Sequence, residues 1–113
     1  MSIGTTPAVE PKSDTAVKLL PPYHVLIEND DQHSQDFVVM VLRKVFGYDE
    51  PKATQLMHAA EEMGEAVVWT GPKEVAELKL DQIRTCHEHR ILNGNPAASI
   101  DLGPLGCRIE PAT

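Results

Sequence analysis

The sequence has few basic residues and no long apolar run. Its 10 lysines and arginines are outnumbered by 17 aspartates and glutamates, which gives a formal net charge of -7 at pH 7. Phosphate backbones are bound by clustered lysine and arginine side chains, so we expect no nucleic-acid partner, and positively charged partners fit better. No apolar stretch approaches the ~20 residues that a membrane-spanning helix requires, so we expect no membrane partner either.

Cysteine is also scarce. The two cysteines, Cys86 and Cys107, lie far apart in the sequence and form no C-x-x-C pair, which argues against a disulfide framework and against a zinc ribbon. The first residues lack the basic and apolar regions of a secretory signal. We therefore expect a soluble, unprocessed monomer in the reducing environment of the cytoplasm.

The length of 113 residues allows one domain with one core. Residues 1–20 contain prolines, threonines and other polar residues with little apolar periodicity, and we predict that they form a flexible N-terminal tail. The folded domain is predicted to span residues 21–113. Pro21-Pro22 stiffens the entry to its first strand.

Apolar periodicity in this domain predicts the order β-α-α-β-α-β. The predicted strands are Tyr23–Glu28, Glu65–Thr70 and Leu105–Glu110. The predicted helices run from His33 or Ser34 to Phe46, from Glu50 to Met63, and onward from Gly71-Pro72 with Ala76, Leu80 and Ile83 facing inward. These elements give an α+β fold, in which three helices pack on a three-stranded antiparallel sheet. Turn-forming residues throughout 92–103 predict a long surface loop.

The rest of the domain can be placed around the end of the first strand. Within the strand, Val25 and Ile27 are expected to face one side and Leu26 the other. The strand runs directly into the polar turn Asn29-Asp30-Asp31, and a helical apolar pattern begins a few residues later. This junction concentrates two carboxylates and one amide where a small site could be built.

Two enzyme-like patterns have plainer explanations. Asp30 and Asp31 could form a catalytic pair, but adjacent acids after a strand are usually turn or cap residues, and no nucleophile accompanies them. The run Cys86-His87-Glu88-His89 contains metal-binding residue types. On a helix these neighbours would point in different directions, so a buried Cys86 beside solvated histidines is favoured over a zinc site. We expect no metal and no cofactor.

From Pro21 to Ala112 the chain resembles the ClpS adaptor family. The matching stretches are Pro21-Pro22-Tyr23, Asn29-Asp30-Asp31, Phe37-Val38, Val41-Leu42, Phe46, Ala53-Thr54-Gln55-Leu56-Met57, Gly64, Glu74-Val75-Ala76-Glu77, Lys79, Pro104-Leu105, Cys107 and Ile109-Glu110. The resemblance implies a non-enzymatic adaptor that docks on the N-terminal domain of a Clp-type AAA+ unfoldase. It also implies delivery of substrates that carry destabilising N-terminal residues, with the flexible tail taking part.

The resemblance also implies which residues do this. The family holds the substrate's free α-amino group at the positions of Asn29 and Asp30, and it uses Glu74 and Lys79 against the unfoldase. An α-amine has a reference pKa of ~7.7 to 8.0, so an anionic and amide acceptor pair can read its charged form. The family's apolar wall for the first side chain falls on Val38, Met57, Ala60 and Leu105.

The chain departs from the family at the site itself. It has His33-Ser34-Gln35 in place of a Thr-Pro-Met run, and Glu61 in place of a histidine on the second helix. Because a carboxylate also accepts hydrogen bonds from an ammonium, our hypothesis is that Asn29, Asp30 and Glu61 together bind the protonated N-terminus. Gln35 replaces a methionine that gates the family's pocket, which leaves the preferred side chain open.

Two alternatives stay open at this point. One is an interaction domain of the same fold that keeps a partner surface and has lost recognition of N-terminal residues. A weaker one is a metal- or carboxylate-dependent enzyme. The segment 92–103 could act as a lid or a second contact surface, although a tolerated surface insertion is the favoured interpretation.

Overall fold

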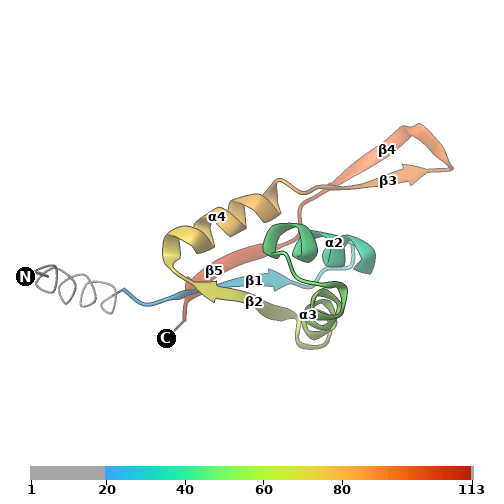
Figure 1. Cartoon of the computed structure of the whole chain (residues 1–113). Coiled ribbons are helices and arrows are strands. Elements are labelled where there is room, and N and C mark those ends of the chain that lie inside the picture. Colours follow the sequence, from blue (N-terminus) through green and yellow to red (C-terminus); the bar gives the residue numbers. More distant parts are fainter. Residues whose placement is uncertain (1–19, 113) are drawn as a thin grey trace, which may run out of the picture.

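The computed structural model describes residues 20–112 and centres on strand β1, Tyr23–Glu28. β1 is paired on one side with β2, Glu65–Gly71, and on the other with β5, Cys107–Pro111 (Figure 1). Both pairings are antiparallel. β1 is therefore the central strand of the sheet, which agrees with its largely apolar sequence.

Three helices complete the domain: α2, Gln35–Phe46; α3, Glu50–Met63; and α4, Lys73–Arg84. Helix α4 packs on β1 and β5, α3 packs against β2, and α2 packs against α3 and α4. The predicted α+β class with an antiparallel sheet is confirmed. Within residues 20–112, the helices are too short or too polar to cross a bilayer.

Local sequence signals explain where the helices begin and end. The Ser34 side chain accepts a hydrogen bond from the backbone N–H of Phe37, and Asp49 caps α3 in the same way. Both helices end at glycines in the left-handed region, Gly47 with φ 73° and Gly64 with φ 88°. Ser34 and Gly64 thereby fix the start of α2 and the end of α3, the two helix ends that border the turn after β1.

Leu26, which is expected on the strand face opposite Val25 and Ile27, is only 3% exposed. Its cross-strand partners are Val67 on β2 and Arg108 on β5. The guanidinium of Arg108 bonds to Glu28 at 3.1 Å and to Glu65 at 2.9 Å. The stem of Arg108 therefore lies across the sheet beside Leu26, as long basic side chains often cover apolar surface.

The prediction of an irregular loop over 92–103 was wrong. Strand β3, Glu88–Leu92, pairs antiparallel with β4, Asn95–Gly103, and the hairpin extends away from the rest of the domain (Figure 1). Asn93 and Gly94 connect the strands with φ values of 54° and 70°. Two successive residues with positive φ form the turn that best matches the twist of a hairpin, and Asn-Gly is its preferred sequence.

Helix α4 ends at Arg84, so Cys86 to His89 do not lie on a helix: Cys86 is buried in the connection, and Glu88 begins β3. The sequence predicts that this helix continues through Cys86, because Cys86 follows the apolar spacing of Leu80 and Ile83. The predicted tail, residues 1–20, lies outside the described residues except for Leu20.

Candidate functional site

Backbone hydrogen bonds fix the end of β1, where the candidate site begins. The N–H of Glu28 donates to the carbonyl of Gly106 at 2.8 Å, and the N–H of Asn29 donates to the carbonyl of Gly64 at 2.9 Å. The chain leaving β1 is thus tied to the end of α3 on one side and to the approach to β5 on the other. Three distant segments meet at this point.

The carboxylate of Asp30 organises the turn that follows. Its Oδ1 accepts hydrogen bonds from the backbone N–H groups of Gln32 and His33, both at 2.9 Å. Its Oδ2 lies 2.9 Å from Nδ1 of His33. Burial by itself would raise the pKa of Asp30, but the hydrogen bonds from His33 and Gln32 outweigh it and hold the pKa below its usual value. Asp30 therefore carries a negative charge at neutral pH.

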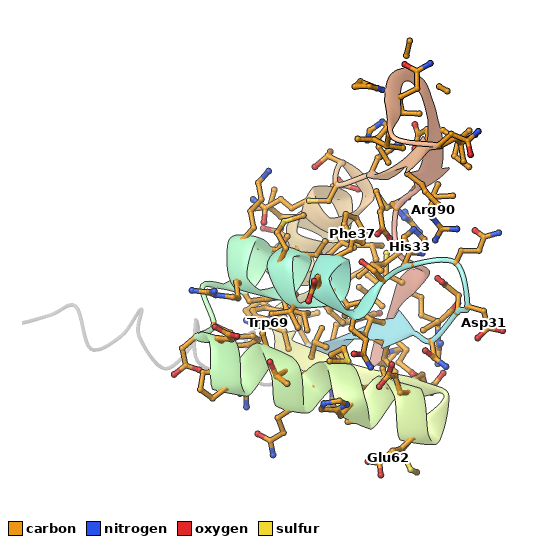
Figure 2. All side chains as sticks on the ribbon, turned by 90° about the vertical axis from the view of Figure 1, so that its right-hand side faces the viewer. Asp31, His33, Phe37, Glu62, Trp69 and Arg90 are labelled. Carbon is orange, nitrogen blue, oxygen red and sulfur yellow. The ribbon has the colours of Figure 1, made fainter. Side chains whose placement is uncertain are left out.

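His33 lies between this carboxylate and the hairpin. Its side chain is only 4% exposed, and its ring stacks on that of Phe37 with centroids 5.3 Å apart (Figure 2). Nε2 lies 2.9 Å from the carbonyl oxygen of Gly103. Burial opposes a charge on the ring, but the bonds to Gly103 and Asp30 outweigh it and raise the pKa of His33. Both ring nitrogens face acceptors, which is the arrangement that suits imidazolium.

Further bonds attach the base of the hairpin to the same turn. Glu88 accepts from the backbone N–H of Ser34 at 3.0 Å and from its hydroxyl at 2.7 Å. Arg90 donates to the carbonyl of Gln32 at 3.0 Å, and its side chain lies near His33 in Figure 2. The hairpin is therefore held against the turn through side chains from both.

Beside the turn is a small cavity between α2, α3 and the segment before β5. All the residues predicted for the amine site and the side-chain pocket line it: Asn29, Asp30, Gln35, Val38, Met57, Ala60, Glu61 and Leu105. Ile27, Glu28 and His33 complete the lining. The cavity volume is about 30 Å³, which corresponds to roughly two water molecules. The apolar wall is in place, but the space is smaller than a leucine side chain needs.

A polar bridge joins two of the residues that line this cavity. The amide nitrogen of Gln35, at the start of α2, donates to both carboxylate oxygens of Glu61 on α3, at 2.8 and 3.1 Å. His58 Nδ1 lies 3.2 Å from the same carboxylate. The bond from Gln35, followed by that from His58, lowers the pKa of Glu61. Glu61 is therefore ionised and exposed, and its partners are the exposed side chains of Gln35 and His58.

The charges around the cavity favour a cation. Asp30 and Glu61 are both held in their ionised forms, while the amide of Asn29 is exposed beside them. His33 neutralises part of the Asp30 charge from the buried side. An ammonium group at the rim would meet carboxylate and amide oxygens, whereas an anion would be repelled.

The residues predicted to contact an unfoldase lie elsewhere. Glu74 is exposed in the first turn of α4, next to the partly exposed apolar side chain of Val75. Lys79 is half-buried and donates to the carbonyl of Val45 at 2.9 Å, with its ammonium 5.8 Å from the ring centroid of Phe46. Lys79 therefore caps the carboxyl end of α2, which the sequence did not indicate.

The structure does not assemble the alternatives that resemble catalytic sites. Asp31 points away from the cavity into solvent (Figure 2). His87 Nδ1 lies 2.9 Å from Asp101, and His89 Nε2 lies 4.0 Å from it, both on the hairpin side. Within the described part of the chain, residues 20–112, no group of three potential metal ligands converges.

His33 is the site residue that sequence reasoning missed. Its spacing to Asp30, three positions later in a turn, is compatible with a side-chain contact. Its second partner, Gly103, is 70 positions away in a segment that was predicted to be a loop. Nothing in the local pattern links these two positions.

Comparison with known families gives a match over most of the chain. The model of the family described as ATP-dependent Clp protease adaptor protein ClpS matches residues 18–94. A protein named ATP-dependent Clp protease adapter protein ClpS from Pectobacterium carotovorum is 41% identical over 97 residues, which cover 84% of this chain and 81% of the relative. The protein of the same name from Salmonella arizonae is 36% identical over 103 residues, covering 89% and 87%.

A solved structure is also similar. It is the structure of Agrobacterium tumefaciens ClpS2 bound to L-phenylalaninamide, with a TM-score of 0.63 and 29% sequence identity. The match covers 80% of this chain and 96% of that chain. The bound molecule in that structure carries a free α-amino group and an apolar side chain.

Proposed function

This chain belongs to the ClpS adaptor family, and from that membership we propose that it binds polypeptides through their free N-terminal amine and first side chain and delivers them to a Clp-type AAA+ unfoldase. The observation that carries the proposal is the convergence of Asn29, Asp30 and Glu61 at the rim of one apolar-walled cavity. In this role the protein is an adaptor and performs no chemistry itself.

Amine recognition follows from the charges. An N-terminal amine with a pKa of ~7.7 to 8.0 is mostly cationic near neutrality. Hydrogen bonds to a charged partner contribute about 1.5 to 3 kcal/mol each. Asp30 and Asn29 are positioned to accept them at the end of β1, and Glu61 adds a second carboxylate from α3. An acetylated N-terminus loses the charge and is expected to bind much more weakly.

Recognition of the first side chain requires the cavity to open. The bond between Gln35 and Glu61 lies at the exposed rim, where water competes with it. Burying a leucine or phenylalanine side chain against Val38, Met57 and Leu105 gains about 1.5 to 3 kcal/mol. We therefore expect Gln35 to rotate away when a large apolar residue enters, which also leaves Glu61 available to the ammonium.

Delivery needs a second surface. We assign it to the exposed start of α4, where Glu74 lies beside Val75 and Leu78, of which Leu78 is 54% exposed. The partner is the N-terminal domain of the unfoldase, and residues 1–20 take part in delivery. The proposed setting is the cytoplasm, and the protein acts as a monomer.

A second function is favoured by one specific observation. The cavity of about 30 Å³ and the Gln35 to Glu61 bridge also suit an interaction domain that binds the unfoldase and reads no N-terminal residue. In that case the bridge is permanent and the cavity is part of the core.

Titration with a panel of short peptides separates the two functions. The peptides begin with Leu, Phe, Tyr, Trp, Arg or Gly and are otherwise identical, and each is prepared with a free and an acetylated N-terminus. We expect dissociation constants of roughly micromolar order for at least one large first residue, weak binding for Gly, and loss of binding on acetylation. Equal affinities for free and acetylated peptides would instead support the second function.

A further inference from the structure

We propose that His33 is a positioning residue, which holds the carboxylate of Asp30 at the rim of the amine site and links it to the base of the β3–β4 hairpin. The inference rests on the function proposed above, and it assigns a role to a residue outside the set that the family resemblance supplied. Its basis is the pair of contacts that the buried ring makes, to Asp30 at 2.9 Å and to Gly103 at 2.9 Å.

The carboxylate of Asp30 can accept more hydrogen bonds than the turn supplies. A carboxylate offers about four lone-pair sites. Oδ1 already accepts from two backbone N–H groups, those of Gln32 and His33, while the ring nitrogen of His33 lies 2.9 Å from Oδ2 and 3.0 Å from Oδ1. Oδ2 therefore retains room for a further donor. The Asp30 side chain is 32% exposed, so an outside donor can reach it.

The protonation of the His33 ring determines how many of its two bonds can form at once. A neutral imidazole has a single N–H, so it can donate to Asp30 or to Gly103 but not to both. Only the protonated ring makes both bonds and is held in one orientation, an orientation that stacking on Phe37 reinforces. Loss of the proton frees either the carboxylate or the hairpin. The ring therefore holds the carboxylate and the base of the hairpin at the same time only while His33 is protonated.

The charged groups around the ring favour this state. Asp30 faces Nδ1 from the same turn, and Glu88 on β3 adds a further attractive charge. Arg90, also on β3, is directed to the carbonyl of Gln32. On β4, Asp101 accepts from the backbone N–H of Gly103. Helix α2 contributes the uncharged ring of Phe37.

The sign of the pH dependence follows from the direction of the shift. The pKa of His33 is raised above the usual value of ~6.5, so its contribution to stability is complete below ~6.5 and is lost as pH rises through the pKa in the folded protein. Amine binding should fall over the same range. The peptide's own amine loses its proton at ~7.7 to 8.0 and adds a second decrease.

Two substitutions separate the two contacts of the ring. The amide nitrogen of asparagine lies about where Nδ1 of histidine lies, and that of glutamine about where Nε2 lies. His33→Asn thus keeps a donor for Asp30, whereas His33→Gln keeps a donor for Gly103. His24→Asn, on β1 and hydrogen-bonded to Thr70, is the control for loss of a histidine outside the site.

Binding of a matched free and acetylated peptide is measured for the full chain and each variant between pH 5.5 and 8, with thermal unfolding as a check on folding. We expect His33→Gln to weaken the free peptide about tenfold, with little change for the acetylated one. His33→Asn should retain the free-amine preference but lose the pH transition that belongs to the His33 ring. His24→Asn should behave as the unchanged protein.

Nitrogen-15 spectra of the histidine rings in the unchanged protein supply a second readout, which holds even if a variant fails to fold. We expect the ring of His33 to keep both protons to a pH above ~6.5, and the Gly103 amide to shift as the ring titrates. A His33 ring with a single proton below ~6.5, or variants that retain both the affinity and the pH profile, would overturn the inference. If the unchanged protein binds free and acetylated peptides equally, the proposed function fails, and these spectra still decide the role of His33.

Discussion

At the residue scale, two polar pairs determine the state of the cavity. Asp30 with His33 lies within the turn and keeps one carboxylate oriented from the buried side. Gln35 with Glu61 spans the rim of the cavity. In the function proposed above, an incoming N-terminal residue preserves the first pair and breaks the second. The two pairs therefore have opposite effects on binding, and substitutions can test them separately.

Replacing the rim glutamine should open the cavity. Gln35→Met removes the donor to Glu61 and adds a flexible apolar side chain next to Val38 and Met57. We expect the affinity for peptides that begin with Leu or Phe to rise about threefold to tenfold, while the dependence on a free amine is kept. Calorimetric titration of the unchanged protein and the variant provides the measurement.

Gln35→Ala is the matched control, because it removes the bridge without adding apolar surface. We expect it to raise affinity less than Gln35→Met, since burial against the side chain supplies part of the gain. If neither variant changes the affinity for any first residue, the bridge does not limit access to the cavity.

The sequence predicted most of the residues that line the cavity, but it did not predict the contacts that hold Asp30 in place. The predicted lining residues, from Asn29 to Leu105, were assigned by matching the motifs of the family. Their convergence could therefore be predicted without any information on side-chain contacts. His33 was seen only as a departure from that pattern. Its role depends on the carbonyl of Gly103, and such long-range partners are set by tertiary packing.

At the element scale, the existence of the three helices was predictable, whereas the end of α4 and the hairpin were not. Helix α3 has the predicted bounds, Glu50–Met63, because Asp49, Pro51 and Gly64 mark its ends with strong local preferences. The hairpin was missed because glycine, asparagine and proline between 92 and 103 were taken as signs of a loop. Asn93-Gly94 is itself a hairpin turn, and strands with both faces largely exposed lack the alternation that marks a half-buried strand.

The start of α2 should be coupled to the hairpin, while the start of α3 should not. Ser34→Ala removes an N-cap and the hydroxyl bond to Glu88, whereas Asp49→Ala removes only an N-cap. We expect each to lower the free energy of unfolding by about 1 kcal/mol. Only Ser34→Ala should speed hydrogen exchange across β3 and β4.

Chemical denaturation and amide exchange of both variants provide the measurements. Equal exchange in the hairpin for Ser34→Ala and Asp49→Ala would contradict the coupling, because it would mean that Glu88 does not hold the base of the hairpin.

At the scale of the whole molecule, the two proposed functional surfaces lie on one small sheet-and-helix scaffold. The acidic cavity is at the end of β1, and the proposed unfoldase surface is at the start of α4. The class of fold, the element order as far as α4 and the family could be predicted, because they depend on patterns that run through most of the chain. The negative net charge of -7 suits a ligand that presents an ammonium group.

The two residues assigned to the unfoldase should behave differently. Lys79→Met keeps an apolar stem near Phe46 but loses the bond to the carbonyl of Val45, so the free energy of unfolding should fall by about 1 kcal/mol. Glu74→Gln should change stability by less than about 0.5 kcal/mol and weaken binding to the isolated N-terminal domain of the unfoldase. Full binding by Glu74→Gln would remove this residue from the docking surface.

The central claim is that a carboxylate at the end of β1 reads a free N-terminal amine. It is tested most directly by titrating one peptide with a large apolar first residue, free and acetylated, into the unchanged protein, Asp30→Asn and Asp31→Asn. Asp31 is adjacent, has the same side chain and is directed into solvent, so Asp31→Asn controls for the change in formal charge. We predict that the preference for the free amine is about tenfold smaller in Asp30→Asn and unchanged in Asp31→Asn. An identical preference in all three proteins would contradict the claim.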